Sequence, residues 1–252
     1  IRDSYRDVQD PAITVTAPLL DSDDVLLLWT TTPWTLPSNL AVAVGEDITY
    51  VRARKKGDDT VYILAKERLK SILGKKAEVL GELKGSELVG KRYQPLFPYF
   101  ADHANAFVVI PSGHVTTASG TGLVHMAPDF GEDDYTASAK AGISVLQSVD
   151  DEGNFVAAVT DYAGRNIKEA DPDIIRDLKA AGRLLRHDTI NHSYPFCWRS
   201  GTPLIYKAVP ARFIKVTALR DRMVEHNKTI HWVPGAVGSG RFGNWLADAR
   251  DW

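Results

Sequence analysis

Hydrophobic and polar residues follow the short period of β-strands through much of the first half of the chain. Residues 13–16 alternate between apolar and polar side chains, as a half-buried strand does. Residues 25–28 form an unbroken apolar run, which predicts a strand buried on both faces. Further strands are expected at residues 40–44, 48–54, 61–64 and 106–110, with a hairpin loop over residues 55–59. The pattern predicts a β-rich region.

Helical spacing occurs in shorter stretches between and after these strands. Helices are expected at residues 65–73, 133–141 and 219–227, and the first two stop at a glycine. The clearest helix has Asp171 as its N-cap, Pro172 at its first position and Gly182 as its stop. Strands and helices together indicate a mixed α/β fold in which strands dominate.

Composition places the chain among ordinary globular proteins. It has 252 residues, of which 44% are hydrophobic and 25% are charged. No apolar run approaches the roughly 20 residues that cross a bilayer, so no membrane association is expected. The first residues, from Ile1 to Ser4, form neither an initiator methionine nor a signal sequence, and we expect a piece of a longer, monomeric, cytoplasmic protein.

The single cysteine, Cys197, excludes an internal disulfide and fits a reducing compartment. His187 and His192 lie near it in sequence, but a structural zinc site usually has four ligands, and Ser200 stands where a second thiolate would be needed. We therefore expect no bound metal and interpret Cys197 as packing beside Trp198.

The formal net charge of −2 argues against strong, general binding of nucleic acid by this chain. Two local basic clusters stand out, residues 52–56 and residues 66–76. Such clusters are either solvated faces or local RNA contacts, and the sequence leaves both readings open.

Residues 29–39, Trp-Thr-Thr-Thr-Pro-Trp-Thr-Leu-Pro-Ser-Asn, follow the apolar strand directly. Thr30, Thr31 and Thr32 are β-branched, so they are able to continue the strand with hydroxyls on alternate faces until Pro33 ends it. One interpretation is that threonine is simply a good strand former. The other is that clustered hydroxyls hold a water, a sugar hydroxyl and an ester oxygen.

A second informative stretch covers residues 120–135 and combines a Gly-Thr-Gly turn, a histidine at a strand end and three acids at a helix start. Acids there offset the helix dipole, which accounts for Glu132 and Asp133 but leaves Asp134 in excess. A lone histidine such as His125 is more often a half-buried structural residue than a catalyst.

Together the two stretches resemble the editing domain, connective polypeptide 1, that is inserted in isoleucyl-tRNA synthetase, a class I aminoacyl-tRNA synthetase. Residues 29–39 resemble its threonine-rich motif, and residues 120–135, Gly-Thr-Gly-Leu-Val-His-Met-Ala-Pro-Asp-Phe-Gly-Glu-Asp-Asp-Tyr, resemble its second motif. Related valyl and leucyl enzymes typically have Thr-Arg-Pro where this chain has Thr-Thr-Pro-Trp, and they lack a histidine at the place of His125. Residues 191–199 and 241–245 also look like the family's return path.

The resemblance implies a β-rich α/β fold with a β-barrel-like core and peripheral helices. Residues 1–192 would form the editing domain, and residues 193–252 would lead back to a synthetic domain that is absent here. The two ATP-binding signatures of class I synthetases are missing from the sequence, so ATP chemistry is not expected and no cofactor is needed. The partners implied are the 3′ end of tRNA(Ile) carrying valine and the rest of the parent synthetase.

The activity implied is post-transfer editing, the hydrolysis of mischarged valyl-tRNA(Ile). Asp134 would bind the α-ammonium of the substrate, and Thr30, Thr31 and Thr32 would orient the ester and the attacking water. The implied substrate-binding residues are Trp34, Thr35, Asn39, His125, Gly120 and Gly122. Among these, backbone amides near Gly120 to Gly122 would stabilise the oxyanion, Trp34 and His125 would wall the pocket, and Asn39 would support the threonines or contact the terminal nucleotide.

Two alternatives stay open. The chain is either an ester hydrolase as described or a non-catalytic module that docks the tRNA end. Within the enzyme class, an editing domain of a valyl- or leucyl-tRNA synthetase is the other reading.

Overall fold

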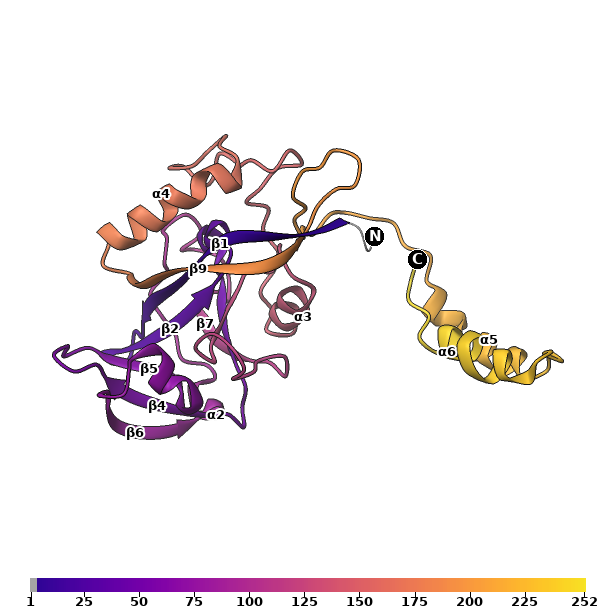
Figure 1. Ribbon diagram of the computed structural model, residues 1–252, viewed down its shortest axis with the longest axis horizontal. Helices are drawn as coiled ribbons and strands as arrows, with labels where there is room; N and C mark the ends of the chain where they lie inside the picture. The colour runs from indigo at the N-terminus through magenta and orange to yellow at the C-terminus, as the bar shows by residue number, and fades with distance from the viewer. Residues whose placement is uncertain (1–3) are drawn as a thin grey trace. The chain divides into compact units, whose positions relative to one another are not determined.

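The computed structural model describes residues 4–252, so the expectation about Ile1 to Asp3 lies outside the described part. The chain forms two compact units, of which the first ends at Ala208 and the second begins at Val209 (Figure 1). The boundary expected after residue 192 falls inside strand β9 (Leu184–Pro195), which pairs along its length with the N-terminal strand β1 (Tyr5–Pro18). Because that pairing holds β9 in the first unit, the unit continues to Ala208.

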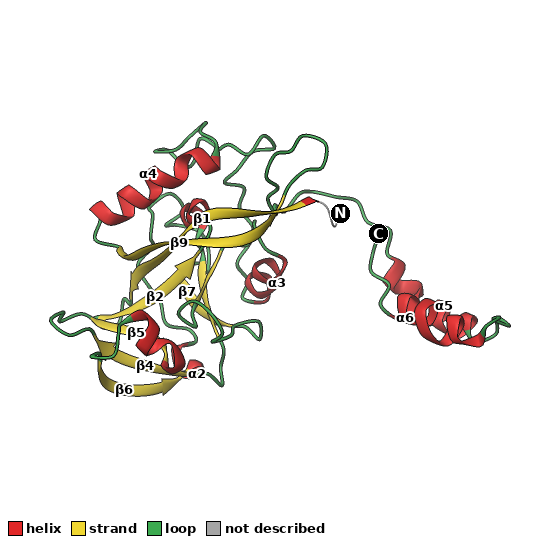
Figure 2. Ribbon diagram, viewed as in Figure 1, coloured by secondary structure: helices red, strands yellow, loops and turns green. Residues whose placement is uncertain are grey.

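The first unit is built on one nine-stranded sheet with the order β6-β4-β5-β2-β8-β3-β7, and β1 pairs with both β2 and β9. The remaining strands are β2 (Asp24–Thr30), β3 (Ala41–Val44), β4 (Thr49–Arg54), β5 (Val61–Ala65), β6 (Glu78–Lys84), β7 (Val108–Pro111) and β8 (Val124–Met126). Parallel and antiparallel pairs are mixed, and the sheet curls into an open half-barrel (Figure 2). The predicted strand-rich α/β fold is confirmed.

Short helices surround this sheet. They are η2 (Pro33–Ser38), η3 (Lys66–Arg68), α1 (Leu69–Ile72), α2 (Gly85–Leu88), α3 (Glu132–Lys140) and α4 (Ile167–Ala180). The second unit contains η4 (Val216–Leu219), α5 (Arg220–Asn227), η5 (Val237–Arg241) and α6 (Phe242–Ala247). Among the described residues, 4–252, no helix is both long and apolar enough to cross a membrane.

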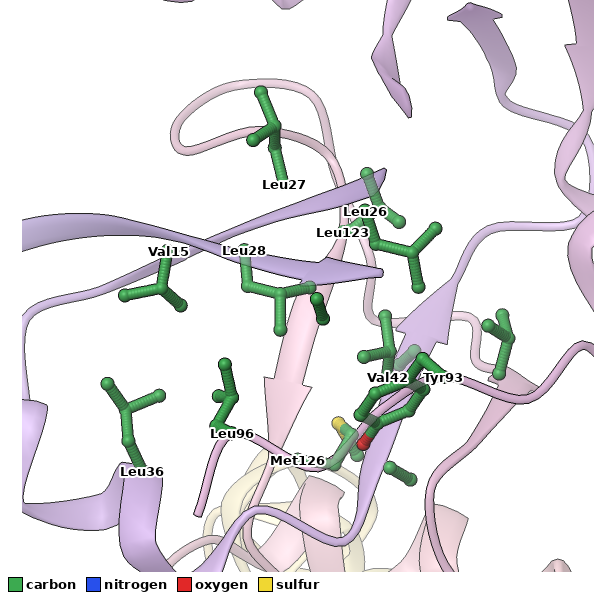
Figure 3. Packing of buried hydrophobic residues seen from close by; sticks show 14 of the residues in the cluster. Val15, Leu26, Leu27, Leu28, Leu36, Val42, Tyr93, Leu96, Leu123 and Met126 are labelled. Carbon is green, nitrogen blue, oxygen red and sulfur yellow. The ribbon is translucent and has the colours of Figure 1, made fainter. Parts of the chain in front are cut away.

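Strand β2 lies in the centre of the core, as its apolar run predicts. It pairs with β1 on one edge and with β5 and β8 on the other, and Leu26, Leu27 and Leu28 are fully buried. Figure 3 shows Leu27 and Leu28 leaving opposite faces of the strand, Leu28 on the side of Val15. Both faces of β2 are therefore covered, which anchors the threonines that follow it.

Helix α4 begins earlier than the sequence pattern predicts. Asn166 is its N-cap and accepts a hydrogen bond from the backbone N–H of Lys168 at 3.0 Å, so the prediction that Asp171 caps the helix is wrong. The buried positions Ile167 and Ala170 extend the apolar stripe by one turn ahead of Pro172. The sequence pattern predicts Pro172 at the first helical position, whereas it lies inside the helix.

Asp171 is consequently a buried carboxyl group. Replacing it with asparagine measures how much stability the protein loses when this group ionises. Burial raises its pKa from 3.8 to about 7, so the native state holds its proton between these values while the unfolded state has lost it. Its contribution to stability is present below pH 3.8 and is lost as the pH rises through about 7. Asparagine stays neutral at every pH. The free energy of unfolding of Asp171→Asn, relative to the wild type, should therefore rise by about 3 kcal/mol as the pH is raised from about 4.5 to about 8.

Urea unfolding at several pH values measures this effect. Asp173→Asn is the matched control, because Asp173 lies on the same helix but is paired with Arg165 and Arg176, which lowers its pKa. The control should show no stability gain with rising pH. If the free energy of unfolding changes with pH in the same way in both variants, ionisation of the buried Asp171 is not the cause of the pH dependence.

Candidate active site

A half-open cavity of about 270 Å³ lies where the two motif stretches meet. It is lined by Trp29, Thr30, Thr31, Thr32, Thr35, His114, Thr116, Ser119, Gly120, Thr121, Gly122, Leu123, Val124, His125, Ala127, Phe130 and Asp134. The stretches converge because β2 and β8 are neighbours in the sheet, with Trp29 paired to Val124 in parallel. Thus Thr35 and His125, 90 positions apart, are in hydrogen-bond contact.

The threonine cluster forms because the chain turns sharply after β2. The strand ends at Thr30, two residues before the expected end, and η2 starts at Pro33. The hydroxyls therefore gather instead of alternating between faces. Thr30 Oγ1 lies 3.2 Å from Thr32 Oγ1, which lies 3.2 Å from Thr35 Oγ1. Within residues 4–252 the Thr31 hydroxyl makes no hydrogen bond, which leaves it available to a ligand.

His125 lines the cavity with an imidazole that is held on both sides. Its Nε2 lies 2.8 Å from Thr35 Oγ1, and its Nδ1 lies 3.0 Å from Asn39 Nδ2. Burial lowers the pKa of His125 to about 4, so the ring is neutral near pH 7. A rigid, uncharged ring is suited to form a wall of the cavity.

Two of the predicted substrate-binding residues do not line the cavity. Asn39 is 3% exposed and lies behind His125. Trp34 is also 3% exposed and packs edge-on against Phe130, with ring centroids 4.8 Å apart. Phe130 is part of the cavity wall, and Trp34 supports it from behind.

Asp134 lies in the first turn of α3 with its carboxylate at the cavity. The N-cap of this helix is Gly131, which makes no side-chain cap hydrogen bond. Asp134 Oδ2 instead accepts a hydrogen bond from the backbone N–H of Ala127 at 2.9 Å. Burial raises the pKa of Asp134, and the Ala127 hydrogen bond and the nearby His114 oppose that shift. Capping therefore does not explain this carboxylate, and Oδ1 remains for a ligand.

The Gly120–Gly122 loop is fixed by its carbonyl groups. The carbonyl of Gly120 accepts from Arg68 Nε at 2.8 Å, and the carbonyl of Thr121 accepts from the N–H of Ala65 at 2.8 Å. In a trans peptide the N–H points opposite to the C=O. The N–H groups of Thr121 and Gly122 therefore point away from these partners, and both residues line the cavity.

Replacing Gly122 with alanine should displace this loop. Its φ of +80° is unfavourable for other residues, and a Cβ there would lie 2.3 Å from the Cβ of Ala65. We expect a loss of about 3 kcal/mol of unfolding free energy in urea titrations. Gly57→Ala is the matched control, because Gly57 has a φ of +81° with nothing within 4 Å of the added carbon. The control should lose only about 1 kcal/mol, and equal losses would show that backbone conformation alone matters.

Several cavity residues were not predicted from the sequence, notably Trp29, His114, Thr116, Ser119 and Phe130. His114 is held by Ser112, whose Oγ lies 2.7 Å from its Nδ1. Trp29 and Phe130 lie within the two motif stretches, so the sequence marked their neighbourhood without assigning them a role. His114, Thr116 and Ser119 come from the irregular segment between β7 and β8, where no local pattern identifies them. Across residues 4–252, no group of three or more His, Cys, Asp or Glu side chains is arranged to hold a metal ion.

Comparison with known proteins identifies the family. The family model for class I tRNA synthetases (I, L, M and V) matches residues 3–252. The isoleucine–tRNA ligase of Bdellovibrio bacteriovorus is 55% identical, over 99% of this chain and 24% of that protein. The cytoplasmic isoleucine–tRNA ligase of Arabidopsis thaliana is 44% identical, over 99% of this chain and 24% of that protein. The chain thus spans about a quarter of the length of the curated relatives it matches.

Solved structures show the same fold at low sequence identity. GlLeuRS-CP1 superposes with a TM-score of 0.54 at 16% identity, covering 73% of this chain and 98% of that one. The editing domain of Plasmodium falciparum cytosolic leucyl-tRNA synthetase gives a TM-score of 0.52 at 9% identity, covering 71% and 98%. The resemblance seen in the two motifs is confirmed: this chain belongs to the class I tRNA synthetases, is homologous over almost its whole length to isoleucine–tRNA ligases, and has the fold of CP1 editing domains.

Proposed function

We propose that this chain hydrolyses the ester of valyl-tRNA(Ile), as the proofreading domain of an isoleucyl-tRNA synthetase. The observation that carries the proposal is that the Asp134 carboxylate and the hydroxyls of Thr30 to Thr32 line the same small cavity. An aminoacyl ester has a free α-ammonium next to the carbonyl that is attacked. A carboxylate beside clustered hydroxyls complements both groups.

Each part of the cavity has a role in this proposal. Asp134 Oδ1 binds the ammonium while Oδ2 stays on the Ala127 amide. The threonine hydroxyls hold the ester and the attacking water. The water oxygen bonds to the carbonyl carbon, the N–H groups of Thr121 and Gly122 stabilise the oxyanion, and the ester C–O bond then breaks. One proton of the water passes to the ribose oxygen of the tRNA, the other is released to solvent, and valine leaves as the carboxylate.

The need for a second site follows from the size of the discrimination problem. Valine is smaller than isoleucine by one methylene, which changes binding in an apolar pocket by only about 1–3 kcal/mol. A cavity that admits valine and excludes isoleucine by bulk reverses the selection made at the synthetic site. The rigid imidazole of His125 serves as the excluding wall, because its two hydrogen bonds prevent it from moving aside.

The direct test is to incubate the chain with tRNA(Ile) charged with labelled valine and to follow release of the label. Fast release with valine, and slow release with isoleucine, supports the proposal. Binding of the tRNA without release would identify a docking module. Preference for another amino acid, compared through valyl, threonyl and isoleucyl esters, would identify the editing domain of a related synthetase.

The proposal includes the tRNA 3′ end and the rest of the parent synthetase as partners, with the chain acting as a monomer in the cytoplasm. It uses no cofactor, since ATP is consumed only at the synthetic site.

A further inference from the structure

A continuous row of buried hydrogen bonds leads from Tyr93 to the threonine cluster. The Tyr93 hydroxyl donates to Asn39 Oδ1 at 2.7 Å, and Asn39 Nδ2 donates to the carbonyl of Ala41 at 2.9 Å. Asn39 Nδ2 also lies 3.0 Å from His125 Nδ1, and His125 Nε2 lies 2.8 Å from Thr35 Oγ1. Figure 3 shows Tyr93 beside the apolar side chains of Val42 and Met126, and Tyr93 is fully buried.

The orientation of the Asn39 amide follows from its neighbours. The carbonyl of Ala41 accepts hydrogen bonds only, so the group of Asn39 that faces it must be the NH₂ group. The opposite atom is then Oδ1, and Tyr93 supplies its donor. Tyr93 is fully buried, and burial raises its pKa well above 10, so it keeps its proton.

The amide orientation determines the tautomer of His125. The second N–H of Asn39 Nδ2 points at His125 Nδ1, which must therefore be a bare acceptor nitrogen. In a neutral imidazole the hydrogen is then on Nε2, and Nε2 donates to Thr35 Oγ1. The Thr35 hydroxyl in turn donates to the carbonyl of Thr32 at 2.8 Å.

We propose that Asn39, held by Tyr93, is a positioning residue that fixes His125 as the Nε2–H tautomer and thereby directs the Thr35 hydroxyl onto the Thr32 carbonyl. The hydroxyls left to bind a ligand are those of Thr30, Thr31 and Thr32. Thr35 accepts from His125 Nε2 and donates to the Thr32 carbonyl, where the row ends, and His125 donates a hydrogen bond and exchanges no proton with the substrate. The catalytic meaning of this arrangement rests on the proposed function, whereas the tautomer does not.

Nitrogen NMR of the full chain labelled with ¹⁵N-histidine tests the tautomer directly. Two-bond ¹H–¹⁵N spectra distinguish protonated from bare ring nitrogens, and the His125→Gln variant assigns the signal. Near pH 7 we expect a bare Nδ1 and a protonated Nε2. Asn39→Asp offers only acceptors and should reverse the pattern. A protonated Nδ1 in the wild type, or an unchanged pattern in Asn39→Asp, would overturn the proposal.

Thr35→Val provides a second test that does not require a buried carboxylate. It removes the acceptor at Nε2 but leaves the Asn39 donor at Nδ1, so the Nε2–H tautomer should persist. A switch to Nδ1–H would show that Thr35 selects the tautomer, which would refute the role of Asn39. These spectra are independent of ester hydrolysis, so an inactive chain with the expected spectra would count against the proposed function alone.

Tyr93→Phe adds a kinetic measurement. It leaves Asn39 Oδ1 buried without a donor, and we expect kcat for valyl-tRNA hydrolysis to fall about tenfold with KM nearly unchanged. Tyr162→Phe is the matched control, since Tyr162 is 2% exposed and donates to Asp177 Oδ2 at 2.7 Å, away from the cavity. Equal losses of kcat in both variants would contradict a specific role for Tyr93.

Discussion

Replacing Asp134 with alanine is expected to lower kcat/KM for valyl-tRNA deacylation by about 100- to 1,000-fold, through loss of the charge-assisted hydrogen bond to the substrate ammonium. Asp134→Asn should lower kcat/KM to a similar extent. The asparagine oxygen retains the geometry to accept from the Ala127 amide, but the side chain carries no charge. Measuring label release for both variants separates the charge from the shape of this side chain.

The matched control is Asp133→Ala, which removes the neighbouring, exposed acid from the same helical turn. Both substitutions weaken the favourable interaction of acids with the helix N-terminus, by about 0.3–1 kcal/mol each. Only Asp134→Ala should lose activity, and both should keep the wild-type circular dichroism spectrum. Full activity of Asp134→Ala would refute its assignment, and loss in both variants would point to helix instability.

His125→Ala is expected to produce the second large effect, a change in selectivity. Removing the imidazole opens the wall that is proposed to exclude the extra methylene of isoleucine, so isoleucyl-tRNA should become a substrate. The ratio of valyl to isoleucyl hydrolysis should fall by about 10- to 100-fold. The variant also leaves Asn39 Nδ2 and Thr35 Oγ1 without one partner each, so some loss of thermal stability should accompany it.

Parallel assays with valyl- and isoleucyl-tRNA measure this ratio. His103→Ala is a suitable control, because His103 is a partly exposed histidine that does not line the cavity. It should leave the ratio unchanged. Continued rejection of isoleucine by His125→Ala would assign the excluding wall to other cavity residues, with Phe130 the first to test.

The sequence predicted the strands and hairpins whose pattern of buried residues is regular. Residues 25–28 are buried on both faces as expected, and the hairpin over residues 55–59 joins β4 to β5 as predicted. Pro172 is a strong local signal and predicts a helix that starts at Asp171, whereas burial of Ile167 and Ala170 in the hydrophobic core extends α4 by one turn. Tertiary burial outweighed local sequence preference there.

The domain boundary was also mispredicted, because it depends on strand pairing between distant parts of the chain. The resemblance predicts a boundary after residue 192, but pairing with β1 keeps β9 in the sheet as far as Pro195. Pairing between residues so far apart in sequence leaves no local signature in either strand. Only the structure could therefore show that β9 exists and where the first unit ends.

The sequence by itself determined the chemical groups of the candidate site, because two long motifs carry the hydroxyls, the glycine turn, His125 and Asp134 at readable positions. Only the tertiary structure decided which of these groups meet in one cavity, that Trp34 and Asn39 lie behind its wall, and that Tyr93 and His114 belong to its surroundings. The physical reason is that residue type and periodicity are local properties. The contacts that set hydrogen-bond direction and burial depend instead on how β2 and β8 pair across the sheet.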